Sequence, residues 1–144
     1  MRSGVSLVAL LLLAGCAAAT PAPADNTAAI CAQWVASTKP FLSRGADAAP
    51  EAKAYNQAMA DAYAGREMPP AESIAIQRAY WGAQEKAPRA LAARATSPRL
   101  RSALSAYADE LAGRGTDVVP EFSGSASPVL QALTAICAPA PARS

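Results

Sequence analysis

Proline is the feature of this chain that most constrains its fold. Prolines open four stretches in which apolar residues recur, at Pro50, at Pro69 and Pro70, at Pro98 and at Pro128. Because the fixed φ angle and missing N–H of proline suit the first turn of a helix, this arrangement predicts helices that begin at these positions. No stretch alternates convincingly between apolar and polar residues, so the pattern favours an all-α domain over a sheet.

The expected positions of the helices follow from these prolines. We expect a first helix over residues 27–38, ended by Pro40, and a second from about Pro50 to Gly65. A third opens after Met68, and Pro88 within its pattern predicts either a kink or two abutting helices. The sequence therefore predicts a small bundle of four to five helices, counting the two described next.

The last two expected helices each begin with a Ser-Pro pair, which supplies an N-cap followed by a first-turn proline. The fourth, from Ser97, has the clearest apolar stripe of the chain and is ended by Gly113 and Gly115. The fifth is short and starts at Ser127. The stripe of the fourth helix consists of Leu100, Leu104, Tyr107, Ala108 and Leu111.

The N-terminal residues have the pattern of an export signal. Arg2 precedes an apolar run over about residues 5–13, which is the length of a secretory h-region and too short to span a hydrocarbon core. The run ends in Leu13-Ala14-Gly15-Cys16, which resembles the bacterial lipobox. The resemblance implies a signal peptide over residues 1–15 and a diacylglycerol, with its palmitate-type chains, on the Cys16 thiol. A permanent membrane anchor and an ordinary signal peptide cut after Ala18 or Ala19 are the alternatives.

The lipobox resemblance also predicts where the mature protein lies. Its acyl chains would anchor it to the cell membrane, or to the outer membrane of a two-membrane cell, facing the extracytoplasmic side. Residues 16–26 then form the lipidated cysteine and a Pro/Ala linker, which favours an extended spacer. The helical domain occupies residues 27–138, and we expect a disordered tail over residues 139–144.

The three cysteines become an even set once Cys16 is assigned to lipid. Cys31 and Cys137 remain, near the two ends of the domain, in an exported and oxidising compartment. A disulfide between them would close a loop of roughly 100 residues and contribute about 4–5 kcal/mol in the chain-entropy model. Two free thiols are the alternative.

The whole arrangement looks like the small, alanine-rich helical lipoproteins of high-GC bacteria, especially actinobacteria. The features that carry the resemblance are Cys16, the Pro/Ala linker, Cys31 with the nearby Trp34, and Cys137. Most members of that group have no established activity, so the resemblance implies location and fold only.

Composition excludes several classes of function. The chain has no histidine, which excludes Ser-His-Asp and Cys-His catalysis and histidine-ligated zinc. No glycine-rich phosphate-binding motif occurs. Without the signal peptide the net charge falls from +2 to about +1, which does not indicate a nucleic-acid partner. We predict no catalytic residue, no metal and no cofactor.

Two features remain as candidate interaction sites. No carboxylate interrupts the segment between Glu85 and Asp109, which we call the basic run, and we name Trp81 as its candidate aromatic anchor. Partners for such a surface are an envelope protein, anionic headgroups or an acidic wall polymer, and the alternative is a solvated helix face. The cationic residues of the basic run are Lys86, Arg89, Arg94, Arg99 and Arg101.

Apolar residues in a loop and a group of aromatic residues offer two further sites. Val118, Val119 and Phe122 either cover one end of the bundle or form a docking patch. Tyr80 and Trp81, with three further tyrosines, either pack in the core or line a ligand cavity.

The sequence thus leads to two hypotheses of function. The first is a lipid-anchored, non-enzymatic interaction module whose partner is unknown. The second is a carrier that holds a hydrophobic small molecule, such as a lipid or a haem-like group, between its helices.

Overall fold

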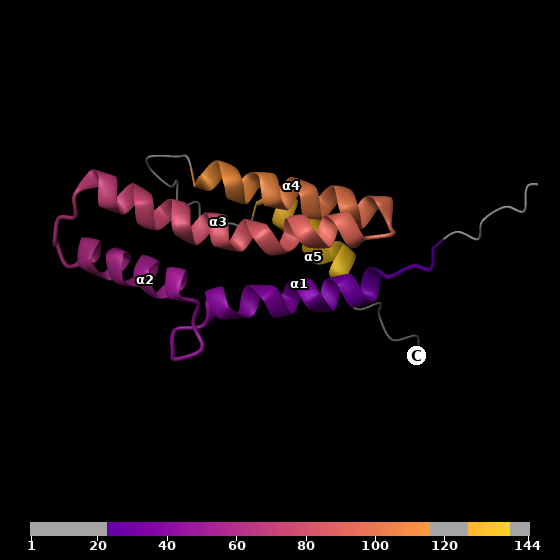
Figure 1. The fold of residues 1–144 in the computed structure, drawn as a ribbon, viewed down its shortest axis with the longest axis horizontal. Helices are drawn as coiled ribbons and strands as arrows, with labels where there is room; N and C mark the ends of the chain where they lie inside the picture. Colours follow the sequence, from indigo (N-terminus) through magenta and orange to yellow (C-terminus); the bar gives the residue numbers. More distant parts are fainter. Residues whose placement is uncertain (1–22, 116–126, 139–144) are drawn as a thin grey trace, which may run out of the picture.

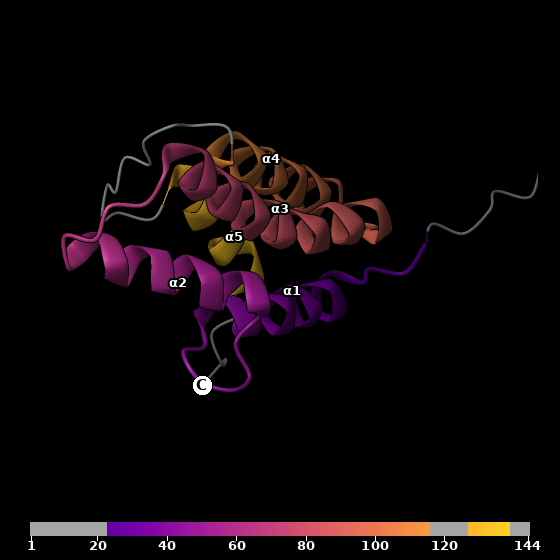
Figure 2. The same cartoon turned by 60° about the vertical axis from the view of Figure 1, so that its left-hand side comes forward.

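The computed structural model describes residues 23–115 and 127–138, which form five α-helices packed together. Helix α1 (Thr27–Leu42) and helix α2 (Pro50–Tyr63) follow one another along one side of the molecule, and α3 (Pro70–Arg94) runs back beside both (Figure 1). Helix α4 (Pro98–Arg114) lies against α3 along its length, and α5 (Pro128–Cys137) packs on α4 and α1 (Figure 2). The prediction of an all-α bundle is confirmed.

The length of α3 determines the layout of the bundle. Its 25 residues span about 37 Å, so one helix is long enough to contact two shorter ones in turn. The C-terminal half of α3 packs with α1 and α4, whereas its N-terminal half packs with α2 and with the last residues of α4. The molecule therefore has two regions that share a single helix.

The prolines and serines begin the helices as the sequence predicts. Pro50, Pro70, Pro98 and Pro128 each occupy the first turn of a helix. The hydroxyls of Ser97 and Ser127 accept hydrogen bonds from the backbone N–H groups of the third residues that follow, at 3.4 and 3.1 Å. Side-chain caps of this kind satisfy one of the unpaired N–H groups of the first turn.

One predicted helix end is wrong. Helix α1 does not stop before Pro40 but continues to Leu42, with Pro40 inside its last turn. So close to the helix end, a proline removes little of the hydrogen-bond ladder. The neighbouring carbonyls also find partners, because Ser43 donates from both its backbone N–H and its hydroxyl to the Lys39 carbonyl and Ala49 donates to the Pro40 carbonyl.

Pro88 does not split the third helix. A single α3 passes through it, and its ring is fully buried between neighbouring helices. Packing of the ring therefore offsets the hydrogen bond that proline cannot donate.

The main core lies between α1, α4, α5 and the C-terminal half of α3. Every residue of the predicted α4 stripe is buried. Leu100 and Leu104 of this stripe, and Leu133 of α5, have no exposed surface. No helix of the described part of the chain is long and apolar enough to cross a membrane. The core consists of Ile30, Cys31, Trp34, Leu91, Ala92, Ala95, Leu100, Leu104, Tyr107, Leu111 and Leu133.

Candidate functional site

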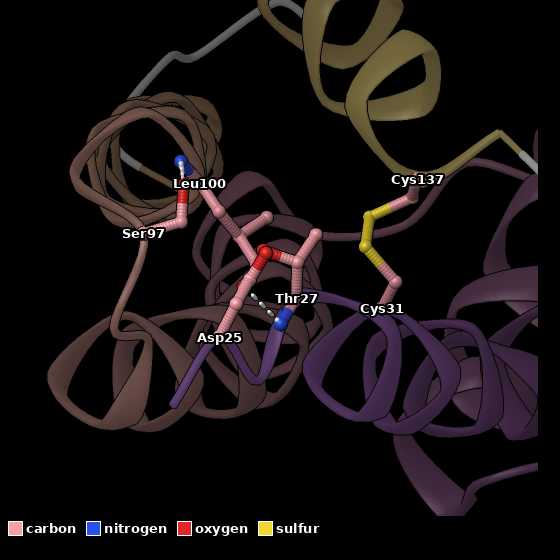
Figure 3. The surroundings of a disulfide bond; sticks show 6 residues. All are labelled: Asp25, Thr27, Cys31, Ser97, Leu100 and Cys137. Atoms are coloured by element: carbon pink, nitrogen blue, oxygen red, sulfur yellow. Dashed lines mark hydrogen bonds between the residues drawn. A yellow bond between two sulfur atoms is a disulfide. The ribbon is translucent and has the colours of Figure 1, made fainter. Parts of the chain in front are cut away.

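A disulfide joins the first helix to the last. Cys31 in α1 and Cys137 in α5 are bonded, with their Cα atoms 5.3 Å apart (Figure 3). The predicted pairing is confirmed, and the alternative of two free thiols is not. Because the bond closes a loop of 106 residues, it links both ends of the domain to the main core.

Arg89 of the basic run is neutralised by two carboxylates of the same molecule. The Arg89 guanidinium contacts the Glu85 carboxylate one turn earlier at 2.6 Å and the Asp109 carboxylate of α4 at 3.1 Å. These two carboxylates raise the pKa of Arg89 above its usual value. Arg89 therefore connects α3 to α4 and is not a free cation for a partner. Lys86 is exposed nearby.

The remaining arginines of the basic run gather where α3 turns into α4. Arg94 donates to the side-chain oxygen of Gln33, and Arg101 donates twice to the Ala95 carbonyl, at 2.7 and 3.2 Å. Arg99 is exposed and lines an open groove of about 480 Å³ between α4 and α5. Because the partners of Arg94 and Arg101 are neutral, these contacts leave the positive charges uncompensated. We call Arg94, Arg99 and Arg101 the arginine end.

Trp81 lies away from the arginine end. It precedes Arg94 by 13 residues of one helix, a rise of about 20 Å. Its ring is half-buried, contacts Tyr55 and Tyr80 edge-on, and is covered by the guanidinium of Arg114 at 5.2 Å from the ring centre. The structure therefore does not bring Trp81 together with the arginines as one exposed surface.

The aromatic residues divide between the two regions of the molecule. Tyr55 of α2 stacks on Tyr80 of α3 with ring centres 4.2 Å apart, and Phe41 meets Tyr80 edge-on. Burial raises the pKa of Tyr55 and of Tyr80, so both phenols stay neutral at physiological pH. Tyr107 instead packs against Trp34 in the main core, where burial also raises its pKa, and Tyr63 is exposed.

A groove of about 580 Å³ runs between α2 and the N-terminal half of α3, and we call it the α2–α3 groove. Its walls are largely apolar, and the two methionines among them can adapt to ligands of different shape. Its polar residues are Arg66, Glu67, Ser73 and Gln77. Its apolar and small residues are Tyr55, Ala58, Met59, Ala62, Gly65, Met68, Pro70 and Ile76.

Unpartnered polar atoms lie beneath this groove and along the same face of α3. The Tyr55 hydroxyl and the Gln77 side-chain oxygen are buried without a hydrogen-bond partner, as is the indole N–H of Trp81. An unpaired buried group costs about 1–3 kcal/mol. The seam between α2 and α3 therefore holds the unpartnered Tyr55 hydroxyl and Gln77 oxygen, while the main core also contains such an atom, the indole N–H of Trp34.

Gly65 shapes one end of the groove. Its φ of +72° is the left-handed conformation that glycine adopts at little cost, and it follows Ala64, the C-cap of α2, in a reversal of the chain. The N–H of Gly65 then reaches the Ala62 carbonyl and the N–H of Arg66 reaches the Asp61 carbonyl. The Arg66 guanidinium also pairs with the Asp61 carboxylate, which lowers the pKa of that carboxyl.

The carboxylates do not form a catalytic or metal-binding group in the part of the chain described. Glu85 and Asp109 are joined through Arg89, and Glu110 accepts hydrogen bonds from Arg114 and from the Ser127 hydroxyl. No three residues of the metal-ligating types come together within residues 23–115 and 127–138.

A contact that sequence reasoning missed fixes the beginning of the domain. Asn26 precedes α1 like an N-cap, but its side chain bonds across the molecule to the α3–α4 turn: it accepts from the Thr96 N–H at 3.0 Å and donates to the Arg94 carbonyl at 2.9 Å. The Thr96 hydroxyl also lies within bonding distance of the Ala24 carbonyl, at 3.2 Å. No local signal reveals this contact, because its partners lie about 70 residues apart in the sequence.

Several predicted features lie outside the described residues. These are the signal peptide, the lipid-bearing Cys16, most of the linker, the loop residues Val118, Val119 and Phe122, and the tail over residues 139–144. Searches of protein-family models, of curated proteins and of solved structures found no match to this chain.

Proposed function

We propose that this protein is a lipid-anchored envelope protein whose helical domain binds an apolar small molecule between α2 and α3, without catalysing a reaction. The lipobox resemblance at Cys16 supports the anchor. The absence of histidine from the whole sequence supports binding over catalysis. Of the two hypotheses from the sequence, we favour the carrier because the α2–α3 groove is concave and largely apolar.

The α2–α3 groove is the observation that carries this proposal. Small-molecule sites are concave, mostly apolar, and carry few polar groups that orient the ligand, and about 580 Å³ is within their usual range of volume. Ser73 and Gln77 supply such polar groups, and they already contact one another at 3.3 Å. Arg66 and Glu67 lie among the lining residues with their charges.

The unpartnered atoms indicate which ligands suit this seam. The Tyr55 hydroxyl can donate and accept, whereas the Gln77 oxygen can only accept. Both atoms are covered, so a ligand reaches them when α2 shifts outward from α3. The position of α2 favours such a shift, because α2 packs on α3 and touches α1 over only a few residues. We expect an apolar molecule that carries a hydroxyl, amide or carboxyl group.

A blocking variant tests the groove. Ala62→Trp places a large ring on an exposed position that lines the groove, and Ala54→Trp places the same ring on an exposed position of α2 outside it. We expect Ala62→Trp to weaken binding of the neutral fluorescent probe N-phenyl-1-naphthylamine by about tenfold, with no change for Ala54→Trp. The binding constant is measured by titration of probe fluorescence.

The same preparation tests for a natural ligand. Mass spectrometry of an organic extract of the purified protein should show a bound apolar molecule, and its amount should fall in Ala62→Trp alone. Equal probe binding by the wild type and both variants, together with an extract free of ligand, would overturn the carrier proposal.

The anchor has its own test. Cys16→Ala should block acylation and leave the chain unprocessed, whereas the mature wild type should begin at a lipid-bearing Cys16. Intact-mass measurement of the protein extracted from membranes shows whether each form has been processed and acylated. An unmodified N-terminus at Ala19 or Thr20 contradicts the lipobox assignment.

A protein-interaction module is the second candidate function. It is favoured by the arginine end, whose charges have no carboxylate partner within the described residues. Crosslinking in intact cells, with the wild type and with a variant in which Arg94 and Arg99 are changed to glutamate, tests it. A protein captured by the wild type and lost in the variant supports this function, and equal capture contradicts it.

A further inference from the structure

The N-terminal tether enters the bundle at a fixed place. Ala24 and Asn26 are bound to Thr96 and Arg94, so the chain meets the domain at the α3–α4 turn (Figure 1). Asp25 stabilises this start by accepting hydrogen bonds from the N–H and the hydroxyl of Thr27, at 2.9 and 2.7 Å. The point where the anchored segment joins the domain is therefore at one end of the molecule.

The tether is also short. Residues 17–24 separate Cys16 from Asp25, and a chain of this length spans at most about 30 Å. That distance is less than the length of α3, about 37 Å. A lipid on Cys16 would therefore keep the α3–α4 turn within about 30 Å of the membrane surface.

The charges are distributed unequally between the two ends. Arg94, Arg99 and Arg101 gather at the tether end, and the contacts of Arg94 and Arg101 are with neutral oxygens. Asp25 is at the same end, with its carboxylate bound by Thr27. Around the α2–α3 turn, the charges of Asp61 and Arg66 cancel, while Glu67 and Glu72 are exposed.

We propose that the arginine end rests on the anionic headgroups of the membrane that anchors the protein, which holds the α2–α3 groove on the side facing away from the bilayer. This rests on the proposed lipid anchor at Cys16. Guanidinium groups bind phosphate oxygens in a bidentate manner, and a tethered cationic end is attracted to an anionic surface within a Debye length of it. The acidic residues around the far turn are repelled by the same surface.

Arginine modification in vesicles tests this orientation. The acylated mature protein is reconstituted into vesicles of phosphatidylcholine alone and into vesicles that also contain phosphatidylglycerol. It is then treated with phenylglyoxal, and the modification rate of each arginine is read by peptide mass spectrometry. Arg44 and Arg78 are internal controls, because both are exposed and lie outside the arginine end.

We expect Arg94, Arg99 and Arg101 to react about threefold more slowly on the anionic vesicles, with the controls unchanged, and high salt to abolish the difference. In the double variant R94Q/R101Q, Arg99 should lose most of its protection. The matched variant R44Q/R78Q, which removes the same charge elsewhere, should leave it protected. Circular-dichroism melts of both variants verify that they fold.

The outcomes separate this inference from the anchor itself. If the mature protein isolated from cells carries no acyl chains and floats with neither vesicle, the anchor is contradicted. An acylated protein that floats with both, but whose arginine end reacts equally on both, overturns the orientation alone. Protection that appears only on addition of a soluble anionic polysaccharide also overturns it, in favour of a wall polymer.

Discussion

The two regions that share α3 differ in how they are held together. Around its C-terminal half, α1, α4 and α5 bury a continuous apolar core and are closed by the Cys31–Cys137 bond. Around its N-terminal half, α2 contributes a few aromatic and methionine contacts and leaves polar atoms unpaired. We infer that the first region supplies most of the stability and that the second is the one able to open for a ligand.

Loss of the disulfide should have the largest effect on this comparison. The double variant C31S/C137S removes the constraint on a loop of 106 residues, and we expect the free energy of unfolding to fall by about 4–5 kcal/mol. Urea denaturation measures it. A loss below about 1 kcal/mol would show that the disulfide contributes little to the stability of the main core.

A pair of truncations compares the packing of the two regions. Leu104→Ala in the fully buried centre of α4 should cost about 2–5 kcal/mol, because it leaves a cavity that the surrounding helices cannot fill. Ile76→Ala at the half-buried wall of the groove should cost clearly less, because solvent already reaches the site. Equal losses in thermal or urea melts would contradict the division into a tight and a loose region.

Removal of the Tyr55 hydroxyl should stabilise the ligand-free protein. Tyr55→Phe keeps the stacked ring and deletes a buried group without a partner, so we expect a gain of about 1–2 kcal/mol. Tyr63→Phe is the matched control, because Tyr63 is 84% exposed and its change should have no effect. A destabilised Tyr55→Phe would mean that the hydroxyl has a partner in solution.

The smallest effect is expected at the turn between α2 and α3. Gly65→Ala meets no neighbouring atom, so the only cost is the left-handed backbone, about 1 kcal/mol. Gly45→Ala, in open space without a positive φ, serves as the control. Thermal melts of the two variants should separate the cost of the conformation from that of the added methyl group.

The helices were predictable because their signals are local. Pro98 and Ser97, or Pro128 and Ser127, are adjacent in the sequence and act within one turn. The buried stripe of α4 follows from helical periodicity alone. Pro40 shows the limit of this reasoning, because a proline in the last turn costs too little to end a helix there.

The candidate surface was less predictable because it depends on distant partners. The i,i+4 spacing of Glu85 and Arg89 favours a pair, but the sequence does not reveal the second carboxylate on Arg89, from Asp109, which lies 20 residues away. Adjacent residues such as Tyr80 and Trp81 point in different directions from a helix, which made Trp81 a candidate for exposure. Both are covered because α3 has neighbours on two sides, with Tyr55 from α2 and Arg114 from α4.

The sequence by itself determined the helical class, the helix starts and the residues that form the disulfide, since each depends on proline geometry, periodicity or the choice among few cysteines. Only the tertiary structure decided which arginines keep an uncompensated charge, where the N-terminal segment meets the bundle and where the groove lies. These properties arise from contacts between residues 20 to 70 positions apart, such as Arg89 with Asp109 and Asn26 with Thr96. Such contacts form only when helix packing brings the distant segments together.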